Sequence, residues 1–173
     1  MDHNSKCKSK EIRFRRLKKS DVPQIQDVAL KSWKYAYRTV YTPKNIRKFV
    51  SRYYSNDSFA NLVFPAIRKN QSCFHVALDG NRVIGYSQVA KTKLGWELLR
   101  IYLLPRYIGR GIGKKLLHHT ERFLKQNHAK AYFAYAHMGN RISLQFYRGS
   151  GFVRKKARDQ SPTSYCFVKE LRH

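Results

Sequence analysis

The amino-acid sequence predicts an α/β (α+β) fold in which helices cover the faces of a mixed β-sheet. Three observations support this prediction. Strand-like runs alternate along the chain with segments of helical periodicity. The turn Asp79-Gly80-Asn81 separates two apolar runs and is typical of a hairpin. The run GWELLRIYLL (95–104) is almost continuously apolar, as expected of a central strand covered on both faces.

The predicted elements follow one another as β, α, α, three strands, and then α, β, α, β, β. Alternating or continuous apolar runs predict strands at 11–17, 72–78, 82–90, 95–104, 131–137, 151–157 and 164–171. Capping residues and helical spacing predict helices that begin after Ser20-Asp21, at Thr42-Pro43, near Ile112 and at Asn140. Residues 58–70 contain Pro65 among apolar residues and match neither pattern. We therefore expect a single domain over 11–173, preceded by a basic flexible tail at 1–10.

The net charge is the most unusual property of the composition. The 173 residues include 36 Lys+Arg and 10 Asp+Glu, which leaves a formal charge of +26. Disorder is not expected, because disordered chains are poor in aromatic residues and this one has 12 Tyr, 10 Phe and 2 Trp. Such a charge predicts attraction to polyanions, namely nucleic acid, anionic lipid or phosphorylated cofactors.

Other features of the sequence indicate the cellular compartment and whether a metal site is expected. No apolar run approaches the roughly 18–20 residues of a membrane span, and residues 1–20 contain no signal-peptide core, so we expect a cytoplasmic protein with no membrane partner. Cys7, Cys73 and Cys166 are odd in number and far apart, which favours reduced structural thiols. The pair His118-His119 belongs to no metal-binding motif, so no metal site is expected.

A glycine-rich loop, RYIGRGIGKK (106–115), lies between the apolar strand and a helix. Glycine permits a positive φ and lets backbone N–H groups approach a ligand. The helix N-terminus adds an oriented positive dipole, and Arg110, Lys114 and Lys115 add charge. The loop therefore predicts a site for a phosphate or pyrophosphate.

Other interpretations of this loop fit less well. A dinucleotide fingerprint needs GxGxxG early in a βαβ unit, whereas the pattern here is GxGxG and lies late in the chain. A GxxxxGK[ST] phosphate loop fails because Lys115 follows Gly113-Lys114. A tight turn without any ligand remains the alternative from the loop alone.

The neighbouring residues strengthen the ligand interpretation. Residues 97–117, ELLRIYLLPRYIGRGIGKKLL, closely resemble the acetyl-CoA-binding motif of the GNAT (Gcn5-related N-acetyltransferase) superfamily. Gly111 and Gly113 occupy its two glycine positions, while Ile108 replaces the usual Gln or Arg. Downstream, NRISLQFYRGSGF (140–152) resembles a second motif of the family, with Ser143 in place of Ala. The resemblance covers residues 11–171.

The resemblance implies a mostly antiparallel sheet of six to seven strands, with about four helices on its faces and a splayed parallel strand pair at the centre. It implies acetyl-CoA as the cofactor, with the pantetheine arm between the splayed strands and the pyrophosphate on the loop amides. The residues that the resemblance assigns to the cofactor are Ile101, Tyr102, Leu103, Gly109, Arg110, Gly111, Ile112, Gly113, Lys114 and Asn140.

The implied reaction, direct attack of an amine on the thioester in a ternary complex, needs a base for the acceptor ammonium and an acid for the departing thiolate. Tyr147 stands where the family often places the acid; its alternative role is packing. For the base we favour Glu97, whose alternative role is an ion pair at a strand edge. A backbone amide near Leu103 is expected to polarise the thioester carbonyl.

The acceptor is less constrained. Trp33, Tyr37 and Tyr41 form part of an aromatic cluster that either packs on the sheet or lines an amine site through cation–π attraction. The stretch 32–55 is similar to polyamine (spermidine/spermine) N-acetyltransferases of the PaiA type, which implies a small polycationic acceptor. The net charge opposes such an acceptor unless the cleft is locally acidic through Asp21, Asp27, Asp57 and Glu97.

Two other functions stay open from the sequence. One is a protein N-terminal or lysine acetyltransferase that works near nucleic acid, held there by its basic surface. The other is a basic module that binds nucleic acid non-specifically and has lost the chemistry, although no RNA-binding signature is present. A homodimer is compatible with the resemblance, but no segment specifies an interface.

Overall fold

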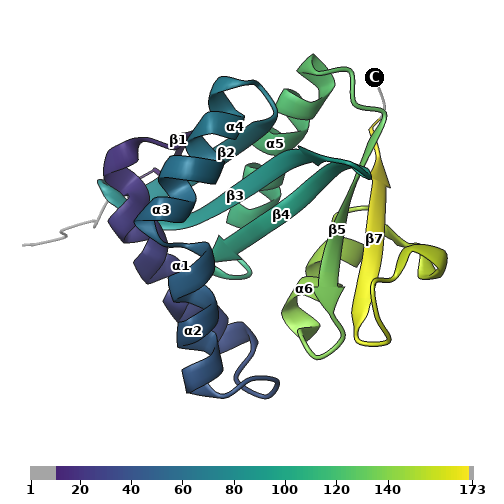
Figure 1. The fold of residues 1–173 in the computed structure, drawn as a ribbon, viewed down its shortest axis with the longest axis horizontal. Helices are drawn as coiled ribbons and strands as arrows, with labels where there is room; N and C mark the ends of the chain where they lie inside the picture. Colours follow the sequence, from purple (N-terminus) through teal and green to yellow (C-terminus); the bar gives the residue numbers. More distant parts are fainter. Residues whose placement is uncertain (1–10, 172–173) are drawn as a thin grey trace, which may run out of the picture.

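The computed structural model describes residues 11–171 and shows a seven-stranded sheet in the order β1-β2-β3-β4-β5-β7-β6 (Figure 1). The strands are β1 (Arg13–Arg16), β2 (Ser72–Asp79), β3 (Arg82–Thr92), β4 (Gly95–Leu103), β5 (Ala131–His137), β6 (Val153–Arg154) and β7 (Ser164–Glu170). All neighbouring pairs are antiparallel except β4 and β5, which run parallel. The prediction of a mixed, mostly antiparallel sheet with a central parallel pair is confirmed.

Helices cover both faces of this sheet. The longer ones are α1 (Val22–Ala36), α2 (Pro43–Tyr53), α5 (Ile112–Gln126) and α6 (Arg141–Arg148). In Figure 1, α1 and α2 lie in front of the sheet and α5 lies behind it. Two apolar cores form around the sheet, one mainly from α1, β2, β3 and the start of α5, and the other mainly from the rest of α5, β5 and β7. Full burial of a core side chain such as Phe167 stabilises the fold by roughly 1.5–3 kcal/mol.

The parallel pair β4 and β5 is paired over a short length only. The register joins Glu97 to Phe133, and no further Cα partners follow between these two strands. Figure 1 shows them meeting at the upper right and separating toward the bottom of the view. A bulge in the β3–β4 pairing near Leu99 changes which side chains of β4 face each side of the sheet. The separation leaves the C-terminal half of β4, from Ile101 to Leu103, without a β5 partner, and the Leu103 carbonyl accepts a hydrogen bond from the Ser32 hydroxyl of α1 at 2.9 Å.

Three local predictions need correction. Residues 58–70 are mostly helical, as a π-turn (Phe59–Val63) between short helices α3 (Asn56–Ser58) and α4 (Phe64–Arg68). The strand predicted at 151–157 shrinks to Val153–Arg154, because Lys156–Arg158 forms a 3₁₀ turn. The third correction concerns the helix cap predicted at Ser20-Asp21, because the Asp21 side chain makes no capping hydrogen bond to α1.

The Asp21 carboxylate does not cap α1. It accepts hydrogen bonds from both terminal nitrogens of Arg15, at 2.7 and 2.9 Å, and from the Lys18 backbone N–H at 2.7 Å. A charged bidentate partner is a stronger donor than a helix N–H. The carboxylate therefore joins the end of β1 to the start of α1.

Within residues 11–171 no helix is long and apolar enough to cross a membrane. The same range contains no group of three or more His, Cys, Asp or Glu side chains placed to hold a metal ion. Cys73 and Cys166 are buried free thiols, whereas Cys7 and the tail predicted at 1–10 lie outside the described residues.

Candidate active site

A cavity of about 490 Å³ opens where β4 and β5 separate. Its walls come from α1, β4, the glycine loop, the start of α5, β5 and α6. The lining residues are Ser32, Tyr35, Ala36, Tyr37, Leu99, Arg100, Ile101, Tyr102, Leu103, Ile108, Gly109, Gly111, Gly113, Lys114, Tyr135, Asn140, Ile142, Ser143, Gln145, Phe146 and Tyr147. Ten of the residues predicted from the sequence are among them: Ile101, Tyr102, Leu103, Gly109, Gly111, Gly113, Lys114, Asn140, Tyr37 and Tyr147.

The glycine loop has the backbone conformation that only glycine adopts readily. Gly109 and Gly111 have φ values of +82° and +75°. Gly111 is the N-cap residue of α5, so the first N–H groups of that helix point out of its N-terminus without helical partners. A Cβ built on either glycine meets no protein atom within 4 Å. The loop thus offers open space next to a positive helix end, which fits a pyrophosphate.

Gly113 serves a different purpose from the other two glycines. A Cβ built on it would lie 3.0 Å from Cε2 of Phe146 in α6. This contact lets the first turn of α5 pack against α6, and both helices contribute to the cavity wall.

Two predicted cofactor residues do not line the cavity. Ile112 is buried in the apolar core. The Arg110 guanidinium lies 5.7 Å from the ring centroid of Tyr107 instead. The side chains of Ile112 and Arg110 therefore pack against the protein, whereas their backbone groups belong to the loop.

Asn140 caps α6 and also faces the cavity. Its side-chain oxygen accepts a hydrogen bond from the Ser143 backbone N–H at 3.1 Å. The residue is buried, with an exposed fraction of 4%. The sequence predicts that this amide forms a hydrogen bond with the cofactor. In the structure its oxygen accepts the capping hydrogen bond of α6.

Tyr147 is buried at the base of the cavity. It packs between Phe152 and Phe167, with ring centroids 5.1 and 5.5 Å away. Burial raises the pKa of Tyr147 well above its ordinary value, and electrostatic interaction with Tyr37 and Glu97 raises it further. The hydroxyl therefore stays protonated at neutral pH.

Glu97 lies on β4 at the single point where β4 and β5 are paired. It does not line the cavity wall, but its charge acts on Tyr147 and on Tyr135. Burial raises the pKa of the Glu97 carboxyl above its ordinary value. Among residues 11–171 it forms no ion pair, in contrast to the paired acids Asp21, Asp27 and Asp159.

The predicted aromatic cluster divides between core and cavity. Trp33 is buried and stacks between Tyr37 and Phe49, at 4.4 and 4.0 Å between ring centroids, so it supports the wall rather than lining it. Tyr37 lines the cavity, and burial raises its pKa. Tyr41 is partly exposed and lies 5.8 Å from the ring of His137, which places it outside the lining.

Of the four acids expected to make the cavity locally acidic, three do not contribute to it, which corrects the expectation for Asp21, Asp27 and Asp57. Asp21 is held by Arg15, and Asp27 pairs with Lys31 at 2.7 Å. Neither these two nor Asp57 lines the cavity. Glu97 is the acid that acts on its aromatic wall.

Arg100 is a cavity residue that sequence reasoning missed. Its guanidinium lies 4.3 Å from the centroid of Tyr54 and donates to the Tyr53 carbonyl at 3.0 Å. No carboxylate within residues 11–171 pairs with it. The available signal was a second charged side chain, three residues after Glu97, inside the apolar run 95–104. Tyr135 and Phe146 were also missed, because only packing decides which aromatic rings face the cavity.

Residues 31–152 match the model of the Acetyltransferase (GNAT) family. The chain belongs to this family. It is therefore an N-acetyltransferase, and its cofactor is acetyl-CoA. The interpretation as a non-catalytic nucleic-acid-binding module is not supported, because the family model spans both motifs and the cavity between them.

Relatives agree with this assignment over nearly the whole chain. The sequence is 28% identical to the spermidine N(1)-acetyltransferase of Thermoplasma acidophilum, over 92% of this chain and 97% of that protein. It is 26% identical to an uncharacterised N-acetyltransferase of Mycobacterium bovis, over 88% of this chain and 99% of the relative.

Solved structures confirm the GNAT fold. The structure of PaiA N-acetyltransferase from Thermoplasma acidophilum in complex with coenzyme A superimposes with a TM-score of 0.86 at 27% identity, covering 92% of this chain and 99% of that one. A GNAT-family acetyltransferase of Staphylococcus aureus superimposes with a TM-score of 0.72 at 13% identity, covering 94% and 100%, and shows the fold alone.

Proposed function

We propose that this GNAT enzyme acetylates a primary amine of a small polyamine. The observation that carries the proposal is the aromatic wall of the cavity, formed by Tyr35, Tyr37, Tyr135 and Tyr147, with Glu97 acting on it. Aromatic faces attract ammonium groups, and Glu97 supplies the negative charge that such an acceptor needs. The similarity to a spermidine N(1)-acetyltransferase over nearly the full length supports the same acceptor class.

The described residues fit acetyl-CoA at the other end of the cavity. The open space at Gly109 and Gly111 and the N-terminus of α5 suit a pyrophosphate, and Lys114 adds positive charge. The free edge of β4 from Ile101 to Leu103 suits the amide-containing arm. When bound, acetyl-CoA supplies the thioester whose acetyl group is transferred to the amine.

Glu97 and Tyr147 are proposed to move the two protons of the reaction. The raised pKa makes the Glu97 carboxylate a better base for the acceptor ammonium, directly or through water. With acetyl-CoA bound, the free amine would attack the thioester carbonyl carbon, and CoA would leave as its thiolate. Tyr147, held neutral by burial, donates a proton to the departing sulfur.

A second acceptor class is favoured by Arg100. This guanidinium pairs with no carboxylate of residues 11–171, lines the cavity and is held by Tyr53 and Tyr54. A cation opposes a polyamine, whereas it suits an acceptor with carbonyl or carboxylate oxygens near the amine. The alternative function is therefore acetylation of a peptide or protein amine.

A thiol-release assay with acetyl-CoA separates these functions. We expect CoA release with spermidine or spermine in wild type, and a raised KM for spermidine in Glu97→Gln. We also expect Arg100→Gln to lower the KM for spermidine, because it removes a repelling charge. Release with N-terminal or lysyl peptides, and none with polyamines, would overturn the polyamine proposal, and Arg100→Gln would then raise the KM for the peptide.

A further inference from the structure

A basic stretch of the chain covers the end of α1, the loop after it and α2. Residues 32–55 contain six Lys or Arg and no Asp or Glu. All six side chains are exposed, and none forms an ion pair within the described range 11–171. We call this surface the α1–α2 basic face; its cations are Lys34, Arg38, Lys44, Arg47, Lys48 and Arg52.

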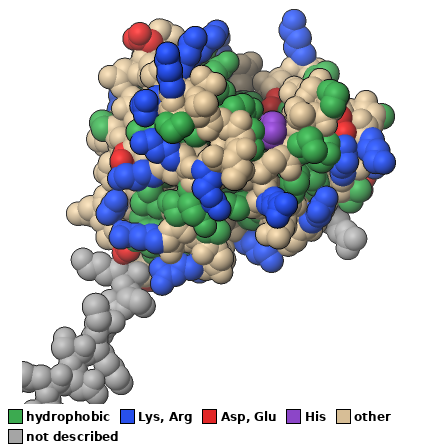
Figure 2. All heavy atoms as spheres, turned by 90° about the horizontal axis from the view of Figure 1, so that it is seen from below, with side chains coloured by type: hydrophobic (Ala, Val, Ile, Leu, Met, Phe, Trp, Pro, Cys, Tyr) green, Lys and Arg blue, Asp and Glu red, His purple; other side chains and the backbone are tan. Residues whose placement is uncertain are grey.

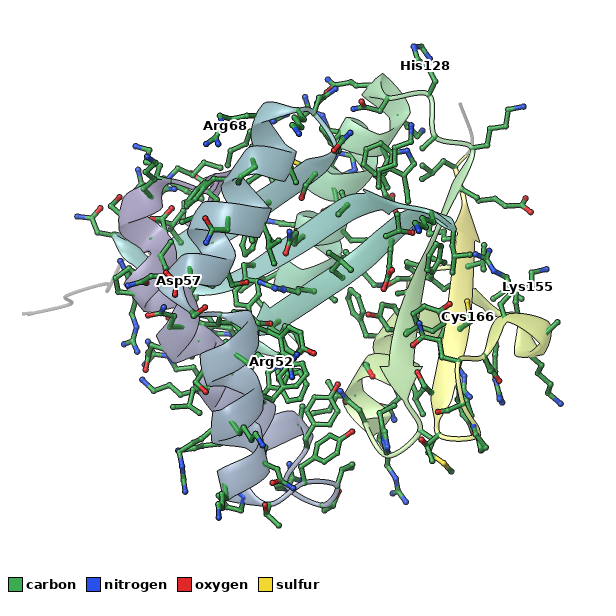
Figure 3. The ribbon with its side chains drawn as sticks, viewed as in Figure 1. Arg52, Asp57, Arg68, His128, Lys155 and Cys166 are labelled. Carbon is green, nitrogen blue, oxygen red and sulfur yellow. The ribbon has the colours of Figure 1, made fainter. Side chains whose placement is uncertain are left out.

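Three of the cations follow one line along α2. Lys44, Lys48 and Arg52 are four residues apart, so the helical rise places neighbours about 6 Å from each other. The line ends near α3, which carries Asp57 (Figure 3). A row of evenly spaced cations is suited to an extended polyanion rather than to a single phosphate.

Exposed aromatic rings lie beside two of these cations. Nine large hydrophobic side chains are exposed in the described part of the chain, and the only aromatic ones among them are Tyr35, Tyr41 and Tyr53, exposed by 41%, 39% and 43%. All three lie on the α1–α2 basic face. Arg38 lies 4.9 Å from the ring centroid of Tyr35, and Arg52 lies 5.5 Å from that of Tyr53.

Figure 2 shows the end of the molecule that carries the loop between α1 and α2. On it, Lys and Arg side chains are spread among hydrophobic ones, and acidic side chains are few. Phosphate-binding cations with interleaved aromatic rings are the combination that binds single-stranded nucleic acid, because any base can stack on a ring while the backbone meets the cations.

We propose that the α1–α2 basic face binds single-stranded nucleic acid beside the entrance of the active-site cavity, which Tyr35 also lines. An anionic membrane fits less well, since the exposed aliphatic side chains that could enter a bilayer, such as Leu62, Leu94 and Val153, lie on other elements. An acidic polypeptide would use the cations but has no need of the exposed rings. The proposal does not depend on which amine is acetylated.

The test measures the anisotropy of labelled single-stranded oligo(U) and oligo(dT) as the full-length protein is added at several salt concentrations. Replacing Lys44, Lys48 and Arg52 together by Gln should weaken binding about tenfold or more. It should also reduce the slope of log Kd against log salt by about 2, because each phosphate contact contributes about 0.7. Stronger binding of oligo(U) than of oligo(dT) would identify RNA as the ligand, and the reverse would identify DNA.

A matched control removes the same charge elsewhere. Arg122 and Lys125 on α5 and Lys130 after it are exposed, and this helix has no exposed Phe, Tyr or Trp ring. Their triple Gln variant should weaken binding less than threefold. Equal weakening by both triple variants would overturn the proposal, since attraction would then come from the net charge of the whole molecule.

The ring contribution is tested separately. Tyr53→Leu keeps an apolar contact with Phe49 and should weaken binding about fivefold to a hundredfold with an unchanged salt slope, as expected from loss of one stacked base. Full affinity in this variant would overturn the proposal. Tighter binding to phosphatidylserine vesicles or to polyglutamate than to either oligonucleotide would overturn it in favour of a membrane or an acidic protein.

Discussion

The backbone of Gly113 in the first turn of α5 lies against the ring of Phe146 in α6, and a Cβ at this position would be 3.0 Å from Phe146 Cε2. This contact joins the helix that carries the glycine loop to the helix that carries Tyr147. The geometry on which the proposed chemistry depends is therefore set by a glycine that has an ordinary helical conformation.

Gly113→Ala should loosen this junction. The added methyl group must displace the Phe146 ring, at a cost of roughly 1–3 kcal/mol, while the change from Gly to Ala in a helix returns about 1 kcal/mol. We expect a loss of about 1 kcal/mol in the free energy of unfolding, measured with urea, and a weaker affinity for acetyl-CoA, measured by calorimetry. Unchanged affinity would show that the contact does not position the loop.

Gly111→Glu should abolish acetyl-CoA binding. The substitution places a side chain and a negative charge in the open space at the N-terminus of α5, and it strains a residue with a φ of +75°. Gly95→Glu is the matched control, because Gly95 also has a positive φ and open space but lies in the β3–β4 turn. Calorimetry should detect binding in the control; binding by Gly111→Glu would contradict the loop assignment.

Tyr147→Phe should lower kcat at least tenfold and leave acetyl-CoA affinity nearly unchanged, because only the hydroxyl is lost from a packed ring. Tyr135→Phe removes the hydroxyl of another tyrosine that lines the cavity and should change kcat less than threefold. Equal kcat values in wild type and Tyr147→Phe would remove Tyr147 from the acid role.

Glu97→Gln should lower kcat/KM about a hundredfold at neutral pH. The rate of the variant should recover as the pH approaches the pKa of about 10 of the acceptor amine, since free amine then needs no base. Glu170→Gln, at the exposed end of β7, is the control and should keep the wild-type pH profile. A uniform loss at every pH would indicate a structural role for Glu97.

The Glu97 carboxyl should also make the free energy of unfolding depend on pH. Burial raises its pKa in the folded state above the usual 4.5, so the folded state binds the proton more tightly than the unfolded state. Wild type should lose stability relative to Glu97→Gln as the pH rises from 4.5 through the raised pKa. Urea unfolding at several pH values measures this difference, and parallel curves would contradict the raised pKa.

The buried His75 should make the protein less stable at low pH, whereas Glu97 makes it less stable as the pH rises. Burial, followed by the charges of His119, Arg16 and Arg122, lowers the pKa of His75 to about 4. The unfolded state therefore binds more protons between pH 6.5 and 4, and stability should fall by roughly 2–3 kcal/mol as the pH drops through that range.

Thermal unfolding should show that His75→Leu flattens this dependence. The control is His128→Asn, an exposed residue whose positive φ of 54° suits asparagine. A wild-type slope in His75→Leu would mean that other groups cause the loss at low pH.

The sequence by itself determined the family, the sheet and the cofactor end of the site. These depend on local signals, because the hairpin at Asp79–Arg82 and the glycine loop need particular residues at fixed spacings along the chain. Most of the predicted loop and β4 residues line the cavity for the same reason.

Only the tertiary structure decided the acceptor end. Trp33, Tyr37 and Tyr41 look alike in the sequence, yet packing buries the first, places the second in the cavity wall and leaves the third outside. Arg15, six residues away, decides that Asp21 cannot make the cavity acidic, and the contacts of Arg100 depend on the fold around Tyr53 and Tyr54. Which side chains meet at this end is set by the packing of elements distant in sequence, and a pattern read along the chain contains no information about that packing.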